Sequence, residues 1–163
     1  MTIIPLLTTF GHFAQFALPI GTGLHALYKG YHKEALSLGA VSGIQNIVVK
    51  LVKNIISAPR PYPNHLRLNS FPSGHTTGAF LAVGFVLALD FVHSQKSNTP
   101  YISTASKACI VALAGIVGLS RHLCRAHWPI DIVAGSFIGM FFGSTGALAP
   151  QWIPRKPQLL LRP

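Results

Sequence analysis

The stretch NSFPSGHTTGAF, residues 69–80, decides how the chain is organised. A Pro-Ser-Gly-His tetrad opens directly onto an apolar run, residues 76–92, in which Asp90 is the single charged residue. Such a run is typical of a membrane span, and the serine before it is a favoured residue at a helix N-terminus. The segment that precedes the run, SAPRPYPNHLRLNSFPS, is polar and proline-rich, and its length indicates a functional loop.

Four further apolar stretches are long enough to be considered as spans, for which about 20 residues are needed. They are residues 3–27, 35–56, 102–120 and 129–149. The first lacks the positively charged start of a secretory signal, so we interpret it as a retained span. We therefore expect an all-α integral membrane bundle of about five transmembrane helices. It forms a single domain over residues 1–163, with a core at about 35–149 and a short tail at 150–163.

Composition supports a membrane protein over a soluble one. Half of the residues are hydrophobic and only 10% are charged, whereas about a quarter are charged in soluble domains. The formal net charge of +10 suggests nucleic acid in a soluble protein, but here the basic residues are scattered between apolar runs. We expect a bilayer as partner and no nucleic acid. Cys109 and Cys124 fit no disulfide or metal motif.

Alternating topology predicts that polar residues gather at one face of the membrane. If all five stretches cross, the second and fourth end at the face where the third and fifth begin. Those four ends carry Lys53 with Arg60, Ser73 with His75, Ser120 with Arg121, and His127 with Asp131. The opposite face receives seven basic residues against six on this one, so the positive-inside rule predicts that the polar cluster faces outward.

Three motifs occupy these ends in order. KNIISAPRP (residues 53–61) fits K-x6-R-P, PSGH fills residues 72–75, and SRHLCRAHWPID (residues 120–131) fits S-R-x5-H-x3-D. Together they resemble the type 2 phosphatidic acid phosphatase superfamily, which includes membrane lipid phosphatases, soluble bacterial acid phosphatases and vanadium haloperoxidases. The resemblance spans about residues 35–149. Membrane members commonly have six spans, one more than the chain predicts.

The resemblance assigns phosphate binding to five residues: Lys53, Arg60, Ser73, Gly74 and Arg121. Phosphoryl transfer spreads charge over three oxygens, which fixed cations and a helix N-terminus stabilise. Each residue also has an ordinary alternative. The basic side chains can extend to lipid headgroups, and the serine can simply cap the helix.

His127 and Asp131 are four residues apart, so a first helical turn would place them on one face. A carboxylate on one ring nitrogen fixes the tautomer and leaves the other nitrogen free to attack phosphorus. The resemblance makes His127 the nucleophile, Asp131 its orienting partner and His75 the general acid. The alternative is a structural His–Asp pair. Six other histidines match no role and are expected in packing or at the surface: His12, His25, His32, His65, His93 and His122.

The scarcity of acids argues against a metal or other cofactor. Only Glu34 and Asp90 accompany Asp131, and both belong near the other face. A Mg²⁺ or Zn²⁺ phosphatase needs several carboxylates or a His–acid cluster. Activity is therefore expected to survive EDTA.

The leading hypothesis is a membrane phosphatase that hydrolyses a lipid phosphate or diphosphate through a phosphohistidine. Family substrates are phosphatidate, phosphatidylglycerol phosphate, undecaprenyl diphosphate and lipid A phosphates. Two alternatives remain open. One is a phosphotransferase that passes the phosphoryl group to another lipid, and the other is a non-catalytic membrane transporter or scaffold. The expected location is a bacterial inner membrane, with the site facing the periplasm or exterior; the oligomeric state is not predicted.

Overall fold

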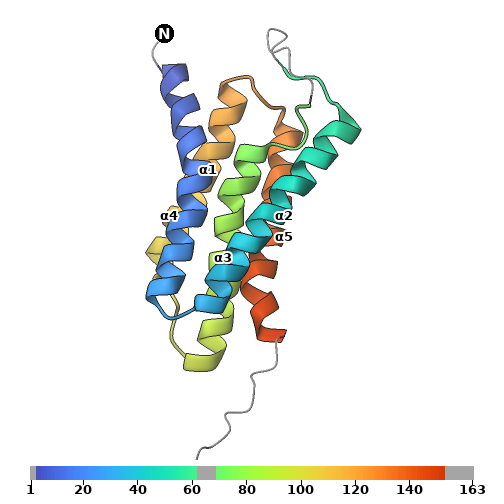
Figure 1. Cartoon of the computed structure of the whole chain (residues 1–163). Coiled ribbons are helices and arrows are strands. Elements are labelled where there is room, and N and C mark those ends of the chain that lie inside the picture. The colour runs from blue at the N-terminus through green and yellow to red at the C-terminus, as the bar shows by residue number, and fades with distance from the viewer. Residues whose placement is uncertain (1–2, 62–68, 153–163) are drawn as a thin grey trace, which may run out of the picture.

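The computed structural model describes residues 3–61 and 69–152. This part of the chain is a bundle of five long helices without strands (Figure 1). They are α1 (Ile3–Tyr28), α2 (His32–Ile56), α3 (Gly74–Ser97), α4 (Thr104–Leu123) and α5 (Pro129–Leu148), followed by the short 3-10 helix η1 (Ala149–Trp152). The all-α class is confirmed, and each helix covers one predicted apolar stretch.

Four segments among the described residues are long and apolar enough to cross a membrane. They are His32–Ile56, Gly74–Ser97, Thr104–Leu123 and Pro129–Trp152, the last of which joins α5 to η1. The chain is an integral membrane protein. Helix α1 is 26 residues long and lies alongside these spans (Figure 1). The fold thus has the five long helices predicted, four of which meet the composition of a span.

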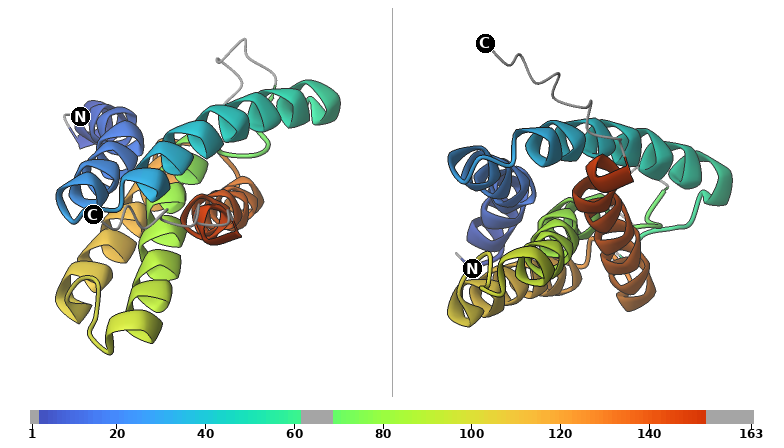
Figure 2. Two further views of the ribbon diagram at one scale, coloured as in Figure 1. Left: turned by 60° about the horizontal axis from the view of Figure 1, so that its bottom comes forward. Right: turned by 90° about the horizontal axis from the view of Figure 1, so that it is seen from below.

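Helix α3 occupies the centre of the bundle. Leu81, Phe85 and Leu89 on it are completely buried. Helices α1, α4 and α5 lie around it, while α2 crosses the bundle obliquely (Figure 2). A helix that other helices cover on several sides is apolar all round, which explains why residues 76–92 are so uniformly apolar.

Glycines bring α5 into backbone contact with α3. A Cβ atom added at Gly139 would lie 2.3 Å from the carbonyl oxygen of Thr77, and one added at Gly143 would lie 2.0 Å from that of Leu81. Neither distance is possible for real atoms, so only glycine permits this approach. Small residues at such contacts are typical of helix packing in membranes.

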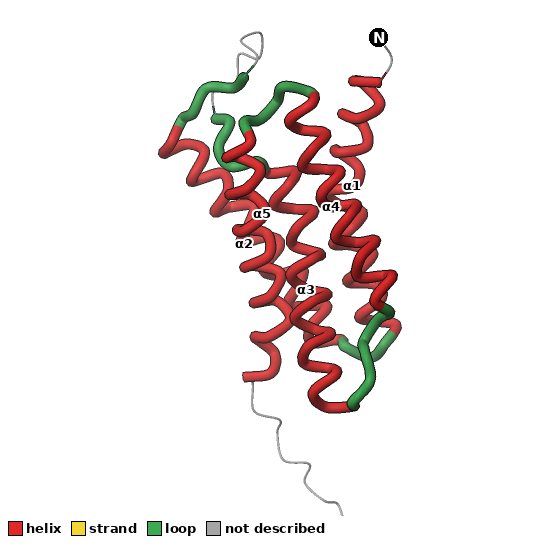
Figure 3. Tube along the Cα trace, turned by 180° about the vertical axis from the view of Figure 1, so that it is seen from behind, coloured by secondary structure: helices red, strands yellow, loops and turns green. Residues whose placement is uncertain are grey.

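The loops alternate between the two ends of the bundle, as the topology predicts. The connections α2–α3 and α4–α5 lie at one end, and α1–α2 and α3–α4 lie at the other (Figure 3). The far end holds the two acids that were expected there. Asp90 forms a 2.7 Å ion pair with Lys107, and Glu34 accepts a 2.7 Å hydrogen bond from Gln151. The tail from residue 153 onward lies outside the described residues.

Candidate functional site

A cavity of about 820 Å³ opens at the end where the α2–α3 and α4–α5 connections meet. Six residues with predicted roles line it: Lys53, Arg60, Gly74, His75, Arg121 and His127. They come from α2, α3, α4 and two connecting loops, so the fold brings together the residues that the three motifs separate by up to 74 positions in the chain, from 53 to 127.

His127 and Asp131 form the buried centre of this end. His127 is 3% exposed and Asp131 is 1% exposed, and Nδ1 of the imidazole lies 3.4 Å from Oδ2 of the carboxylate. The helical-turn argument is wrong for His127, because α5 begins at Pro129 and His127 lies before its N-cap, Trp128. Asp131 is in the first turn and accepts a 2.9 Å hydrogen bond from the backbone N–H of Trp128. The helix cap therefore fixes the carboxylate, and the carboxylate in turn orients the ring.

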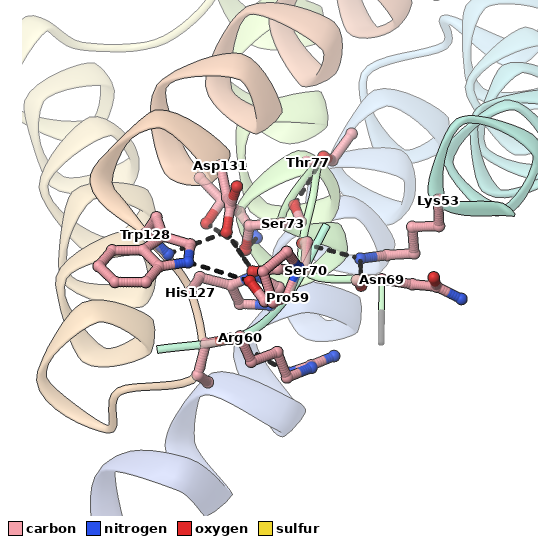
Figure 4. A network of polar contacts seen from close by, with 12 residues as sticks. Lys53, Pro59, Arg60, Asn69, Ser70, Ser73, Thr77, His127, Trp128 and Asp131 are labelled. Atoms are coloured by element: carbon pink, nitrogen blue, oxygen red, sulfur yellow. Dashed lines mark hydrogen bonds and ion pairs between the residues drawn. The ribbon is translucent and has the colours of Figure 1, made fainter. Parts of the chain in front are cut away.

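Ser70 completes this centre, and the sequence argument did not identify it. Its completely buried hydroxyl donates to Oδ2 of Asp131 and lies 3.4 Å from Nδ1 of His127 (Figure 4). With Asp131 and Ser70 both facing Nδ1, the Nε2 atom is the ring nitrogen left for chemistry in the cavity. The only signal in the sequence is that Ser70 is a small polar residue two positions before the PSGH tetrad.

Burial lowers the pKa of the His127 imidazole below its ordinary value. The cations of Lys53 and Arg60 lower this pKa further, while the carboxylate of Asp131 opposes the shift. Charging a buried ring next to two cations is unfavourable, so His127 is neutral at pH 7. A neutral imidazole has a free lone pair, which an attacking nitrogen requires.

Two of the cations are held by backbone oxygens of the loops. Lys53 Nζ donates to the carbonyl oxygens of Asn69 (2.9 Å) and Ser70 (3.1 Å), and Arg60 Nη1 donates to that of Ala126 (3.2 Å) (Figure 4). Lys53 thus ties the end of α2 to the loop that carries Ser70. Both cations also line the cavity, where their charge is available to an anion.

Arg121 is anchored by the first helix. Its side chain is almost fully buried, and Nη2 donates to the carbonyl oxygens of Leu7 (2.9 Å) and Thr8 (3.2 Å). Gly11 makes this approach possible, because a Cβ atom there would lie 2.5 Å from Nη2. The three motifs lie outside α1, yet α1 determines where this guanidinium lies.

Helix α3 begins directly at the cavity. The Ser73 hydroxyl accepts hydrogen bonds from the backbone N–H (3.4 Å) and the hydroxyl (2.9 Å) of Thr76, and its own N–H donates to the carbonyl oxygen of Asp131 (2.9 Å). Ser73 is completely buried and acts as the helix cap, whereas Gly74 lines the cavity. The N–H groups of the first turn have no partner within the helix and carry the positive end of its dipole.

His75 meets a second histidine that the sequence argument left without a role. Nε2 of His75 lies 2.9 Å from Nδ1 of His12 on α1, and both side chains line the cavity. A histidine inside an otherwise uncharged span was the available signal, because polar groups at membrane depth are unfavourable without a partner. His12 therefore belongs to the site end of the bundle.

The remaining residues near the three motifs have structural contacts or lie away from the site. Trp128 is half-exposed and donates from Nε1 to the carbonyl oxygen of Pro59 (3.0 Å). Cys109 and Cys124 are not joined in a disulfide, and Sγ of Cys124 lies 3.5 Å from Oγ1 of Thr8. His65 lies outside the described residues. Within the described ranges, no group of three or more His, Cys, Asp or Glu residues is arranged to hold a metal ion.

The geometry defines a class of protein: a helical integral membrane protein with a cavity at one end of its bundle, walled by cations and an oriented imidazole. Residues 34–156 match the family model described as the PAP2 superfamily, which is well over half of the chain. The chain belongs to the PAP2 superfamily.

Two bacterial proteins are similar to this chain in sequence. A lipid A 1-phosphatase from Porphyromonas gingivalis is 29% identical over 138 residues, which are 80% of this chain and 28% of that protein. The bacitracin transport permease protein BcrC from Bacillus licheniformis is 25% identical over 147 residues, 83% of this chain and 66% of that protein. The chain thus spans less than two thirds of the length of either relative.

Two solved structures share the fold. LpxE of Aquifex aeolicus superposes with a TM-score of 0.65 at 21% identity, covering 88% of this chain and 84% of that one. A transmembrane PAP2 type phosphatidylglycerolphosphate phosphatase from Bacillus subtilis gives a TM-score of 0.68 at 21% identity, covering 94% and 79%. The arrangement of helices is therefore that of transmembrane PAP2 proteins.

Proposed function

We propose that the chain is a metal-independent membrane phosphatase that removes phosphate from a lipid phosphate or diphosphate. The observation that carries the proposal is the cavity in which His127 and His75 lie together with Lys53, Arg60 and Arg121. The neutral, oriented imidazole of His127 supplies a nucleophile, and the three cations match the charge of a phosphoryl group in transfer. The similarity of the chain to a lipid A 1-phosphatase and to a phosphatidylglycerolphosphate phosphatase supports the same chemistry.

The reaction has two steps. Nε2 of His127 attacks phosphorus while the bond to the leaving oxygen breaks, and His75 protonates that oxygen as it departs. A water molecule, which gives one proton to His75, then attacks phosphorus and breaks the P–N bond, so that inorganic phosphate is released and both histidines return to their starting states. Asp131 keeps Nδ1 oriented throughout and stabilises the positive charge that the ring acquires. The cations of Lys53, Arg60 and Arg121 and the N-terminal turn of α3 bind the three non-bridging oxygens.

The site faces the periplasm or exterior in this proposal, because the opposite face carries the larger number of basic residues in the sequence, seven against six. A substrate in the outer leaflet reaches the cavity from the membrane side. Transfer of the phosphoryl group to a second lipid uses the same first step. Release of inorganic phosphate, compared with formation of a phosphorylated acceptor, separates hydrolysis from transfer.

The decisive experiment measures phosphate release from a panel of lipid phosphates and diphosphates by the purified chain and its His127→Ala variant. We expect at least about a 10³-fold loss of kcat in the variant, because its nucleophile is gone. Activity of the unaltered chain should persist in excess EDTA.

His122→Ala is the matched control, since His122 lies exposed on the last turn of α4 and does not line the cavity. Equal phosphate release by wild type and His127→Ala on every lipid would refute the catalytic assignment. Phosphate-dependent transport that persists in His127→Ala, without any hydrolysis, would favour the non-catalytic alternative.

A further inference from the structure

The cavity does not end at the catalytic residues but continues between α1 and α2. Its α1 wall contains Thr8, His12, Gln15 and Pro19. These positions recur every three or four residues, so they form one face of the helix. Thr8 marks the catalytic end of this wall, because its carbonyl oxygen accepts a hydrogen bond from Arg121. Gln15 lies two helical turns after Thr8. The wall therefore runs from the catalytic end into the interior of the bundle.

The α2 wall of the cavity is polar where a membrane helix is normally apolar. Ser42, Gln45 and Asn46 line it and share one helix face with Lys53. Gln45 is 1% exposed, and among the described residues its Oε1 atom has no hydrogen-bond partner. A buried amide oxygen without a partner is unfavourable, and more so in hydrocarbon, where water is absent. This wall is therefore suited to a ligand that brings hydrogen-bonding groups of its own.

The polar wall lies at a defined depth below the cations. Gln45 precedes Lys53 by eight residues, which is about 12 Å along a helix. Helices α1 and α2 are joined at the far end and diverge toward the catalytic end (Figures 1 and 2). If the phosphate of a lipid lies beside Lys53, the group that carries this phosphate would thus lie between α1 and α2.

We infer that this cleft selects lipids whose phosphate is carried on an acylated polar core with amide, ester or hydroxyl groups, in preference to a polyprenyl phosphate. The inference rests on the proposed phosphatase function and specifies its substrate class. Side-chain amides offer both donors and acceptors, which match the carbonyl and hydroxyl groups of an acylated amino sugar or glycerol. A polyprenyl chain has no such groups in this region and would leave Gln45 and Asn46 against hydrocarbon.

Sites that hydrogen-bond a substrate reject analogues without the matching groups by large factors, because the polar groups of the site remain unpaired. We expect the unaltered protein to have a kcat/KM at least about tenfold higher for an acylated polar core than for a polyprenyl diphosphate.

The experiment compares three substrates in the same detergent micelles: an acylated glucosamine 1-phosphate, a phosphatidate and a polyprenyl diphosphate. Phosphate release gives kcat/KM for the wild type, Gln45→Met and Asn46→Leu. We expect each variant to lose most of the preference for the acylated substrates, through their kcat/KM, while turnover of polyprenyl diphosphate is unchanged or rises. The glucosamine and glycerol arms show which acylated core the cleft prefers.

Asn54→Leu is the matched control, because Asn54 is exposed on the same helix and does not line the cavity. It should keep the wild-type preference. Parallel losses on all three substrates, no change in preference, or a wild type that prefers the polyprenyl diphosphate would overturn the inference while leaving the phosphatase proposal standing. Absence of phosphate release from every lipid by the wild type would instead refute the proposed function, and the inference with it.

Discussion

Ser70 shows how much of the site depends on a residue outside the three motifs. Its hydroxyl bonds Oδ2 of Asp131, the same oxygen that lies 3.4 Å from Nδ1 of His127. Asp131 Oδ2 thus serves the ring, the hydroxyl and the backbone N–H of Trp128 together. Removing one member changes the orientation of the other two, because a buried carboxylate has no water to replace a lost donor.

Replacing Ser70 by alanine should therefore lower kcat with little effect on KM. The loss of one buried hydrogen bond to a carboxylate corresponds to about 1.5–3 kcal/mol, or about tenfold to 150-fold in rate. Steady-state kinetics on the best lipid substrate measure this. KM should stay unchanged because the substitution leaves in place the cations that are proposed to bind phosphate.

Ser136→Ala provides the comparison, since the Ser136 hydroxyl donates only within its own helix, to the carbonyl oxygen of Ile132. An unchanged kcat in Ser70→Ala, with the protein as stable as wild type, would contradict a role of Ser70 in positioning the pair.

The sequence could predict residues that chemistry requires at fixed spacing, but not those recruited by contact. Lys53, Arg121 and His127 follow from motif spacing and topology, because alternating spans must bring those ends together. His12 and Ser70 depend on how α1 and the α2–α3 loop pack onto the motif-bearing helices. No local pattern encodes such contacts, so they emerge only with the tertiary structure.

At the level of the helices, the length of each apolar stretch was sufficient to predict where a helix lies. The predicted stretch 35–56 became His32–Ile56, and 129–149 became Pro129–Leu148. The ends shifted by a few residues because caps, rather than apolarity, set helix boundaries: Ser73 extends α3 to Gly74, and Ser103 starts α4 at Thr104. The apolar length of a stretch does not reveal which helix it packs against, so the tight contact between α3 and α5 emerges only with the tertiary structure.

The α3–α5 contact can be tested with a single methyl group. Gly143→Ala should destabilise the protein, because the added Cβ would lie 2.0 Å from the Leu81 carbonyl oxygen and the backbones must separate. Overpacking of this kind typically reduces stability by about 1–3 kcal/mol. Thermal unfolding in detergent, followed by circular dichroism, measures the change.

Gly115→Ala should increase the stability of the protein slightly or leave it unchanged. An added Cβ there meets nothing within 4 Å, and alanine favours a helix by about 0.5–1 kcal/mol over glycine. If Gly143→Ala were as stable as Gly115→Ala, the close approach of α5 to α3 would be wrong.

At the scale of the whole molecule, the two ends of the bundle carry different charged groups. Asp90 and Lys107 pair at the end opposite the cavity, and the cations of the site lie at the other. The bundle therefore presents two chemically different faces to the two sides of a bilayer, and its orientation decides which pool of lipids it meets.

The proposed orientation predicts which face a membrane-impermeant thiol reagent reaches. In a background with Cys109→Ala and Cys124→Ser, a Ser57→Cys variant should be labelled in intact cells, and a Thr99→Cys variant only after lysis. Both positions are exposed: Ser57 caps the C-terminus of α2, and Thr99 lies in the α3–α4 connection. The α2–α3 and α3–α4 connections lie at opposite ends of the bundle (Figure 3). The reverse labelling pattern would place the cavity on the cytoplasmic side.

Arg121 donates hydrogen bonds to the carbonyl oxygens of Leu7 and Thr8, and these bonds matter when the chain is shortened. A version cut to the family-matched segment 34–156 keeps every signature residue yet discards the two acceptors that seat this guanidinium. We therefore expect the smallest active segment to include α1, although the family match begins only at residue 34.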